Sequence, residues 1–458
     1  MLWMLLLAGA LVRGAVAWAY SPGLFYFDSW LYLGMAARGN PVEFAPDRPI
    51  GYAALLKLAL SALGGLTSVI ALQHLAGLGV AMLVYRLLTQ LGAHRGVALT
   101  ATGVVALDGY EIALEQHVLP EAFFALTLLA SMYLLVAGRL TTARVTASGL
   151  LLAGAVLLRT AGVFAIPAWI AFVLVSLPDV RRRLVAVSAL LAPLAVYVVL
   201  FGAVTGELAL SESDGWFLYQ RVAQIGDCRE IQVPRSAMAL CNTPPSYRPQ
   251  DPSEYIYGPE SPAVRAFGPL AGTSARVAHA NSVLRAYALA VIEQHPAAYL
   301  KLVAGDFLRF FEPEVASPGR ESLTYELPPR HLLLYWDDPP LRETLFPDYR
   351  PVVHGPAAAI RAYVRWVHLP GWVIGVLLLA SLLAVVRRSV LGRERRSSTP
   401  AALLLFGVAL CILLGSVAST LFRVRYLIPT EPLLICAIAL TLFPAAPRRS
   451  GAVAERAG

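Results

Sequence analysis

The sequence predicts an all-α protein that crosses a membrane many times. Of its 458 residues, 57% are hydrophobic and only 14% are charged, and the mean hydropathy is +0.63. A soluble protein of this length needs far more polar surface to stay dispersed. Apolar runs of about 17 to 25 residues, long enough for a helix to cross a bilayer, recur along the chain. These observations together predict a polytopic membrane protein.

We expect about ten membrane spans. They lie near residues 2–20, 66–88, 97–112, 119–138, 145–159, 161–177, 184–204, 366–386, 401–421 and 426–443. The first span lacks a basic stretch at its start, so we interpret it as retained, with a cleaved signal peptide as the alternative. The apolar run 51–65 is short and contains Lys57, so we expect a juxtamembrane helix on the outer surface there.

Positive charge gathers in short clusters between the apolar runs. The clusters contain the arginines at 86 and 95, 139 and 144, 181–183, 387–396 and 448–449. This pattern is typical of cytoplasmic loops, so the net charge of +8 indicates orientation and not a nucleic-acid partner. We therefore expect a multi-pass plasma-membrane protein with a cytoplasmic N-terminus. Residues 21–65, 108–118, 205–365 and the turn around Arg423 then face outward.

The spans divide the chain into three expected parts. These are a membrane module of about seven spans at 1–204, an extracytoplasmic domain at 205–365, and a membrane module of about three spans with a short cytoplasmic tail at 366–458. In the middle part we expect irregular structure, rich in proline and tyrosine, that gives way to helix near 274–312 and breaks at His295-Pro296. We see no internal repeat, which is evidence against inverted-repeat transporters.

Two of the four cysteines lie in the expected outer domain. Cys228 and Cys241 are 13 positions apart there, and such a pair outside the cytosol is expected to form a disulfide. The closed loop would stabilise the domain by about 3 kcal/mol in the chain-entropy model. Two free thiols are the alternative. Cys411 and Cys436 lie within spans, where we expect small apolar roles, and no spacing indicates structural zinc.

Acidic residues concentrate in two segments that are expected to face outward. The first segment contains Asp28, Glu43 and Asp47, and the second with its flanks contains Asp108, Glu111, Glu115 and Glu121. Carboxylates are costly in and near a bilayer, so their grouping predicts one polar site at the outer membrane face. For each residue alone, an exposed or capping role is the alternative; Asp28 in particular precedes a stretch typical of a short surface helix.

Arginines end several spans on the same side. Arg159 ends the fifth span, and Arg423 and Arg425 end the ninth, close to Tyr426 and Glu431. An arginine in this position often extends to the lipid phosphates, which is the alternative interpretation. A guanidinium group is also well suited to bind a phosphate through two hydrogen bonds. A carboxylate, arginines and a position at the lipid interface together indicate a lipid-linked phosphate substrate.

Five short segments stand in a recognisable order. YFDSWLYLGMA follows the first span, RPIGYAALLKL precedes the second, HVLPEAFFAL opens a later one, LLRTAGVFAIPA follows the fifth, and RVRYLIPTEPLL begins the last. This order resembles the GT-C superfamily of polyprenyl-phosphate-sugar-dependent glycosyltransferases, which includes protein O-mannosyltransferases and the enzyme that adds aminoarabinose to lipid A. The resemblance covers most of the membrane portion and is one of order and context. The outer domain with its cysteine pair resembles that of actinobacterial members.

The resemblance implies a hexosyl- or pentosyltransferase that moves a sugar from a polyprenyl-phosphate donor to an acceptor, with inversion at the anomeric carbon. Asp28 matches the family's catalytic aspartate and is implied to be the general base. Many relatives have Asp-Glu where this chain has Asp28-Ser29, so Glu43 or Asp47 would have to supply a second acid. Arg423, Arg425 and Arg159 are implied to bind the donor phosphate.

Further residues are candidates for the acceptor or sugar site. They are Asp47, Arg48, Tyr52, Asp108, Glu111, Glu121, Tyr426 and Glu431. Some relatives use a divalent metal, and the resemblance makes Asp108 or Glu121 plausible ligands. Three oxygen ligands cannot be identified from their spacing, so we assign no metal and leave a divalent ion open. The acceptor is open between a protein, a lipid and a cell-wall glycan.

Two other functions stay open at this level. A transporter or flippase of lipid-linked glycans would carry polar residues at mid-depth in its spans, whereas the ionisable groups here cluster at one face. A non-catalytic cell-envelope assembly protein would tolerate the loss of Asp28. A sugar-transfer assay on the wild type and on Asp28→Asn separates these functions from an enzyme.

Overall fold

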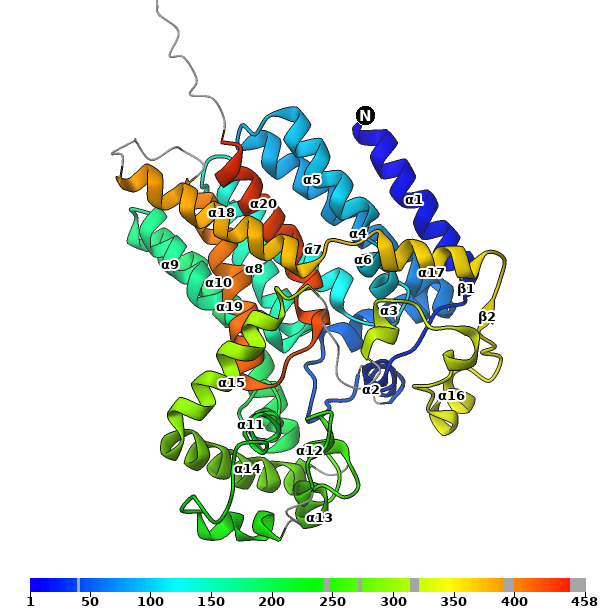
Figure 1. The fold of residues 1–458 in the computed structure, drawn as a ribbon, viewed down its shortest axis with the longest axis vertical. Coiled ribbons are helices and arrows are strands. Elements are labelled where there is room, and N and C mark those ends of the chain that lie inside the picture. Colours follow the sequence, from blue (N-terminus) through cyan, green and yellow to red (C-terminus); the bar gives the residue numbers. More distant parts are fainter. Residues whose placement is uncertain (39–41, 243–246, 271–273, 314–320, 391–398, 445–458) are drawn as a thin grey trace, which may run out of the picture.

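The computed structural model describes residues 1–38, 42–242, 247–270, 274–313, 321–390 and 399–444. Within these residues the protein is built almost wholly of helices (Figure 1). The two strands described, β1 (Tyr20–Ser21) and β2 (Val352–Val353), are two residues long and pair antiparallel. The expected all-α class is therefore confirmed. The expected cytoplasmic tail at 445–458 and the arginines at 393–396 lie outside the described residues.

Six segments are long and apolar enough to cross a membrane. They are α1 (Leu2–Ala19), α4 (Gly65–Gln90), α10 (Val180–Thr205), Ala357–Arg387, α19 (Thr399–Ser419) and Val424–Leu442. Two of these are composite: Ala357–Arg387 comprises α17 (Ala357–Trp366) and most of α18 (Gly371–Val390), and Val424–Leu442 comprises η5 (Val424–Tyr426), η6 (Ile428–Thr430) and α20 (Glu431–Leu442). This content confirms a polytopic membrane protein.

The remaining expected spans coincide with bent or shorter apolar helices. α5 (Arg95–Leu107) and α6 (Gly109–Glu115) form one pair bent by 46°. The shorter elements are α3 (Gly51–Leu63), α7 (Glu121–Val136), α8 (Thr142–Leu158), η1 (Thr160–Ala165) and α9 (Ile166–Ser176). The segment expected to be a juxtamembrane helix is thus helical, as α3.

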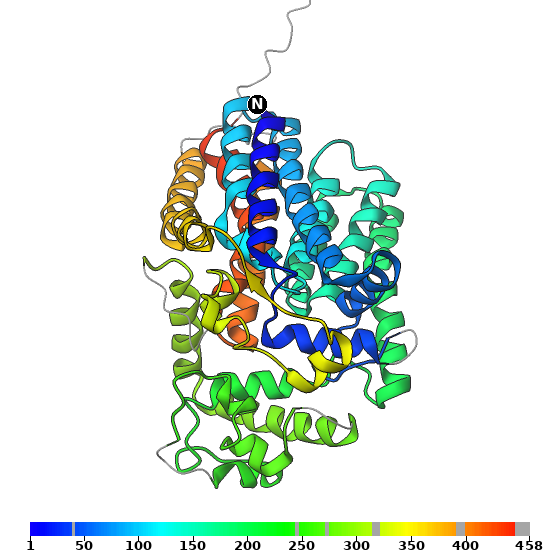
Figure 2. The ribbon, with the colours of Figure 1, turned by 90° about the vertical axis from the view of Figure 1, so that its right-hand side faces the viewer.

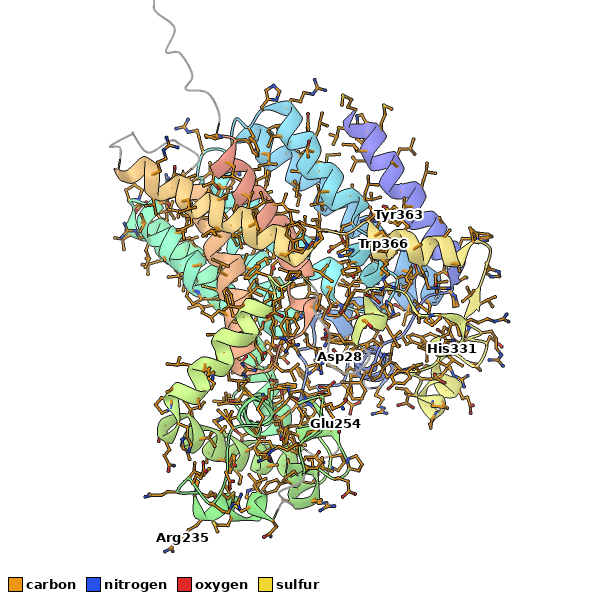
Figure 3. The ribbon with its side chains drawn as sticks, in the orientation of Figure 1. Asp28, Arg235, Glu254, His331, Tyr363 and Trp366 are labelled. Atoms are coloured by element: carbon orange, nitrogen blue, oxygen red, sulfur yellow. A yellow bond between two sulfur atoms is a disulfide. The ribbon has the colours of Figure 1, made fainter. Side chains whose placement is uncertain are left out.

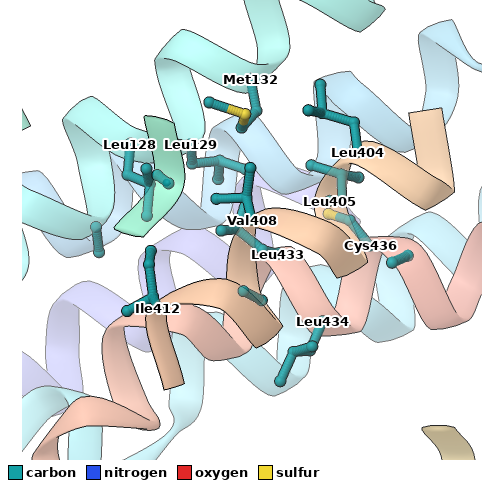
Figure 4. Close-up of a cluster of buried hydrophobic side chains, with 14 of the residues drawn as sticks. Leu128, Leu129, Met132, Leu404, Leu405, Val408, Ile412, Leu433, Leu434 and Cys436 are labelled. Carbon is teal, nitrogen blue, oxygen red and sulfur yellow. The ribbon is translucent and has the colours of Figure 1, made fainter. Parts of the chain in front are cut away.

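The main hydrophobic core lies where α7, α19 and α20 meet (Figure 4). Leu129 and Met132 of α7 pack there with Val408 of α19 and Leu433 of α20, all 1% exposed or less. A hydrogen bond joins α7 to the neighbouring helix α8: Ser131 Oγ of α7 donates to the carbonyl of Ser148 of α8 at 2.8 Å. These contacts form the rigid frame on which the longer loops are positioned.

A buried ion pair holds α1 in the helix bundle. Arg13 of α1 donates through Nε and Nη2 to the two carboxylate oxygens of Glu115, each at 2.7 Å. His74 Nδ1 lies 2.7 Å from Glu115 Oε2, and all three residues are at most 6% exposed. Because both charges are hydrogen-bonded, their burial is tolerated. The first helix therefore packs as an integral member of the bundle.

A helical region with its own core lies beyond one end of the bundle (Figures 1 and 2). Its helices are α11 (Asp214–Val222), η2 (Arg235–Cys241), α12 (Glu254–Tyr257), α13 (Pro262–Phe267), α14 (Ser274–Gln294) and α15 (Pro296–Arg309). Trp216 of α11 and Leu284 of α14 are fully buried in this core. Cys228 and Cys241 form the expected disulfide, and the expected helix breaks at His295, so both expectations are confirmed.

The chain then returns to the bundle through short elements. They are η3 (Glu321–Thr324), η4 (Arg330–Leu332), α16 (Pro339–Leu345) and β2. This return segment packs against α2 (Phe27–Ala37) and the chain before it. Trp30 Nε1 donates to the carbonyl of Trp336 at 2.7 Å, and Tyr349 Oη donates to the carbonyl of Gly23 at 2.9 Å. The boundaries expected for the outer domain, 205–365, stay a prediction.

Candidate functional site

The helix α2 places Asp28 in its first turn, behind the N-cap residue Tyr26. Ser29 Oγ accepts a hydrogen bond from the Tyr26 backbone N–H at 2.9 Å, so Ser29 serves the helix start. The interpretation of Asp28 as a helix cap is therefore wrong. Its carboxylate instead accepts from Arg48 Nη2 at 2.9 Å through Oδ1 and from Arg425 Nη2 at 2.5 Å through Oδ2. Figure 3 shows Asp28 between the helix bundle and the helical region beyond it.

The two arginines decide the charge of Asp28. Burial by itself raises the pKa of this carboxyl, but Arg425 and Arg48 outweigh burial and hold its pKa well below the usual range. Arg48 is itself fixed by its neighbour Asp47, whose backbone carbonyl accepts from Nη1 at 2.8 Å and whose Oδ2 lies 3.6 Å away. Burial raises the pKa of Asp47, and Arg48 partly opposes this effect. Asp28 is consequently an ionised, doubly held carboxylate.

A second carboxylate lies between two arginines from distant helices. Glu121, which begins α7, has Oε1 2.8 Å from Arg159 Nη1 and 3.8 Å from Arg425 Nη1. Arg159 also lies over the ring of Tyr426 at 4.8 Å, and Arg425 lies over the ring of Tyr26 at 4.9 Å. Three buried atoms here have no hydrogen-bond partner among the described residues: Glu121 Oε2, Arg159 Nη1 and Arg425 Nε. Arg159 and Glu121 thus form an ion pair whose geometry does not meet the angular requirement of a hydrogen bond.

Arg423 is held by acids from outside the bundle. Its Nη2 donates to Asp251 at 2.8 Å and 3.1 Å, and its Nη1 lies 4.0 Å from Glu321 Oε2. Burial raises the pKa of Glu321, although Arg423 and Arg425 oppose this rise. The sequence did not single out Asp251, in a bend before α12, or Glu321, at the start of the short η3, because no periodicity or motif marks an acid there.

These side chains line one cavity of about 580 Å³. Its charged wall contains Asp28, Arg48, Glu121, Arg159, Asp251, Glu321, Arg423 and Arg425. Another part of the wall comes from membrane helices and the segments beside them, including Val163, Phe164 and Leu421. A further part comes from α11 and the chain around α12, including Phe217, Gln220 and Tyr257. The cavity therefore joins an apolar wall, a charged centre and a polar aromatic wall.

Four of the predicted candidates lie elsewhere. Tyr52 is buried and donates to Gln73 Oε1 at 2.5 Å. Asp108 caps α6 by accepting from the backbone N–H groups of Tyr110 and Glu111 at 2.9 Å and 3.0 Å. Glu111 and Glu431 flank a separate space of only about 10 Å³ with Asp108. The exposed Glu43 does not line the cavity, whereas Tyr426 does, and Asp47 reaches it through Arg48.

The described residues that the resemblance offers as metal ligands have other partners. Among the described residues no group of three His, Cys, Asp or Glu side chains is placed to hold one. Of the two expected ligands, Asp108 accepts backbone N–H groups and Glu121 faces Arg159. The acids around the cavity centre face guanidinium groups, which hold the same positive charge that an ion would bring. We therefore derive no step through a metal.

Comparison with known proteins finds a family model that matches part of the membrane portion. The sequence model of the dolichyl-phosphate-mannose-protein mannosyltransferase family matches residues 67–203. This match confirms the resemblance to the GT-C superfamily. No curated protein matches the chain in a sequence search.

The solved structures to which this chain is similar are remote in sequence. The Archaeoglobus fulgidus oligosaccharyltransferase tethered to an acceptor peptide is 13% identical, with a TM-score of 0.42, over 96% of this chain and 49% of that one. ArnT from Cupriavidus metallidurans bound to undecaprenyl phosphate is 12% identical, with a TM-score of 0.36, over 96% of this chain and 76% of that one. The chain thus spans about half the length of the oligosaccharyltransferase.

Proposed function

We propose that the protein is a membrane glycosyltransferase that transfers a sugar from a polyprenyl-phosphate donor to an acceptor hydroxyl. The observation that carries this proposal is a cavity in which the buried carboxylate of Asp28 lies with Arg48, Arg159, Arg423 and Arg425 beside membrane helices. Arginines recognise a phosphate, and an adjoining apolar wall suits a lipid chain. The family match over residues 67–203 supports the same reaction class.

The donor phosphate binds between Arg159 and Arg425 in this proposal. Both side chains have a buried nitrogen without a hydrogen-bond partner among the described residues, and both flank Glu121. Arg423 is less available because Asp251 already occupies it with two hydrogen bonds. The polyprenyl chain then lies along Val163, Phe164 and Leu421, which form the apolar part of the cavity wall. Arg159 and Arg425 stabilise the negative charge that grows on the leaving phosphate.

Asp28 is the general base in this proposal. The acceptor oxygen attacks C1 of the sugar while its proton passes to the Asp28 carboxylate. The bond between C1 and the phosphate oxygen breaks, and its electron pair leaves with polyprenyl phosphate. The attack comes from the face opposite the leaving group, so the anomeric configuration inverts. The proton on Asp28 is released to water after the products depart.

The reaction takes place on the extracytoplasmic face, with the N-terminus in the cytoplasm. This orientation follows the distribution of basic residues between the spans. It is supported by the way in which the segments expected to face outward converge: Asp28, Glu121, Arg159, Asp251 and Arg423 line one cavity. The start of α1 lies at the other end of the bundle (Figure 1).

Sugar transfer by Asp28→Asn tests the proposal. The wild type and the variant are reconstituted in lipid vesicles with a panel of synthetic polyprenyl-phosphate sugars and with protein, lipid and glycan acceptors. Loss of a general base lowers kcat by about 10²–10⁴-fold. Glu43→Gln, which changes an exposed acid of the same segment, is the matched control and keeps full activity. Undiminished transfer by Asp28→Asn, or an inactive wild type with every donor, refutes the proposal and favours a transporter or an assembly protein.

A further inference from the structure

The proposed base, the Asp28 carboxylate, is weakened by two hydrogen-bonded arginines in this structure. Each carboxylate oxygen of Asp28 already accepts a hydrogen bond from an arginine, Oδ1 from Arg48 and Oδ2 from Arg425. A carboxylate held by two cations is a weak base, because proton transfer to it must overcome both interactions. The reaction therefore needs an event that frees one oxygen, and this inference rests on the proposed function.

The two arginines are not held equally. Arg48 has a second acid beside it, since Asp47 accepts from it through its backbone carbonyl at 2.8 Å and places Oδ2 at 3.6 Å. It also lies over the ring of Phe217 at 5.5 Å. Arg48 can thus keep its position whatever happens to Asp28 Oδ2.

Arg425 is placed between two acids and lacks a full set of partners. Its Nη2 is 2.5 Å from Asp28 Oδ2 and its Nη1 is 3.8 Å from Glu121 Oε1, a distance too long for a hydrogen bond. Its Nε has no hydrogen-bond partner among the described residues, and the side chain lines the cavity. A phosphate that binds beside Arg159 would also lie close to the Arg425 guanidinium, because both arginines flank Glu121 in the cavity.

We propose that the donor phosphate unblocks the base by drawing Arg425 away from Asp28. With Arg425 on the phosphate, Asp28 keeps one hydrogen bond from Arg48, which orients it, and its Oδ2 is free to accept the acceptor hydroxyl proton. Arg425 acts twice, first as a clamp on Asp28 and then as a ligand of the leaving phosphate. Arg48 is a positioning residue. The donor consequently binds before the acceptor can be deprotonated.

Competition between Asp28 and phosphate for Arg425 makes a thermodynamic prediction. Removing the Asp28 charge releases Arg425 and tightens phosphate binding, but only while Arg425 is present. Simple repulsion between Asp28 and the phosphate also weakens binding, yet that repulsion persists without Arg425. A double-mutant cycle separates the two effects, because coupled residues give non-additive changes.

The probe is undecaprenyl phosphate, without a sugar, titrated into the full-length protein in lipid nanodiscs. We expect Asp28→Asn to bind it about tenfold more tightly than the wild type does, and Arg425→Gln to bind it about tenfold more weakly. Adding Asp28→Asn to Arg425→Gln should then change the affinity less than twofold. Arg423→Gln is the matched background, in which Asp28→Asn should still tighten binding about tenfold, since Asp251 and not Asp28 holds Arg423.

The outcomes are distinct. An equal gain from Asp28→Asn with and without Arg425 shows plain repulsion and overturns the clamp, as does no gain at all, while the proposed transfer reaction stands. A wild type that does not bind the lipid phosphate at any concentration removes both proposals. Arg425→Met and Asp28→Ala replace any variant that does not yield a monodisperse protein, and the same non-additivity is expected of them.

Discussion

At the residue scale, the cavity is a network of buried charges that neutralise one another. Asp28 pairs with Arg48 and Arg425, Glu121 with Arg159, and Arg423 with Asp251. Burying a single charge without a partner costs several kcal/mol, so each member depends on the others. These ion pairs also keep the carboxylates ionised and the arginines charged before a substrate binds.

The acid side of the activity profile should depend on Arg48. Burial, the largest influence on the Asp28 carboxyl, raises its pKa, and only the two arginines bring it below the usual range. Arg48→Gln leaves Arg425 to oppose burial alone, so the pKa of Asp28 rises. Since the ionised form is the base, the acid limb of the pH profile of kcat/KM, which reports the free enzyme in which Arg425 still holds Asp28, should move to higher pH. Sugar-transfer rates measured from pH 4 to 8 check this shift.

Arg48→Gln should also lower the stability of the protein in mild acid. A carboxyl with a lowered pKa contributes stability that is complete above its unfolded-state pKa and is lost as the pH falls through its folded-state pKa. The wild type therefore keeps this contribution in mild acid. As the pH is lowered, Arg48→Gln begins to lose it at a less acidic pH than the wild type does. Arg48→Lys, which retains the charge, is the control for the profile. Superimposed acid limbs for wild type and Arg48→Gln would show that Arg48 does not set the ionisation of Asp28.

Sequence reasoning found the charged cavity residues that stand close to apolar runs and missed Asp251 and Glu321 of the middle part of the chain. Asp28, Arg159 and Arg425 each follow or precede an apolar run, so the expected topology already placed them on one side. Asp251 lies in a bend before α12 and Glu321 begins the short η3, and the course of both segments depends on tertiary contacts that no local pattern encodes. Asp108 was misleading for a related reason: an acid at a helix start serves either as a cap or as a site, and here it caps α6.

At the element scale, helix packing depends on small residues beside buried charges. Gly77 of α4 lies against the Arg13–Glu115 pair, and a Cβ there would overlap Glu115 Oε1 and come within 2.9 Å of Arg13 Nη2. No regular pattern of apolar residues reveals such a contact, although the positions of the spans themselves were predictable from hydropathy. The pairing of β1 with β2 was equally hidden, because it joins two-residue segments that are far apart in the chain.

Gly77→Ala should destabilise the bundle although alanine is the better helix former. The added methyl displaces the Glu115 carboxylate and breaks a buried ion pair, at a cost on the order of 3 kcal/mol. Thermal unfolding in detergent, followed by loss of the monodisperse peak, measures the effect. Gly154→Ala in α8 is the control, because nothing lies within 4 Å of a Cβ there, and it should leave stability equal or slightly higher. Equal behaviour of the two variants would contradict this account of the packing.

The disulfide should stabilise the helical region beyond the bundle. Cys228 and Cys241 close a loop next to the core that contains Trp216. Their joint replacement by serine should lower the free energy of unfolding of this region by about 3 kcal/mol. Limited proteolysis, read as the rate of cleavage within residues 205–310, checks the loss. Joint replacement of Cys411 and Cys436, which are free thiols, by alanine should leave that rate unchanged.

At the scale of the whole molecule, the cavity is an assembly of distant parts of the chain. Asp28 and Arg425 are 397 positions apart in the sequence, yet they touch. Segments at the ends of the bundle helices bring Arg159, Arg425 and Glu121, whereas the helical region beyond the bundle brings Asp251 and the α11 wall. A substrate with a lipid chain on one side and an acceptor on the other would have to meet both parts. The proposed reaction therefore depends on the helical region lying outside the cytoplasm.

Single-cysteine labelling tests this orientation. In a background where Cys411 and Cys436 are alanine, we introduce Ser282→Cys on α14 or Thr142→Cys at the start of α8, both at exposed positions. The positive-inside pattern places Ser282 outside and Thr142 inside, next to Arg139 and Arg144. A membrane-impermeant maleimide added to intact cells should modify Ser282→Cys, and should modify Thr142→Cys only after permeabilisation. The reverse pattern would put the cavity on the cytoplasmic side, where the donor would have to present its sugar to cytoplasmic acceptors, and the Cys228–Cys241 disulfide would then lie in a reducing compartment that disfavours it.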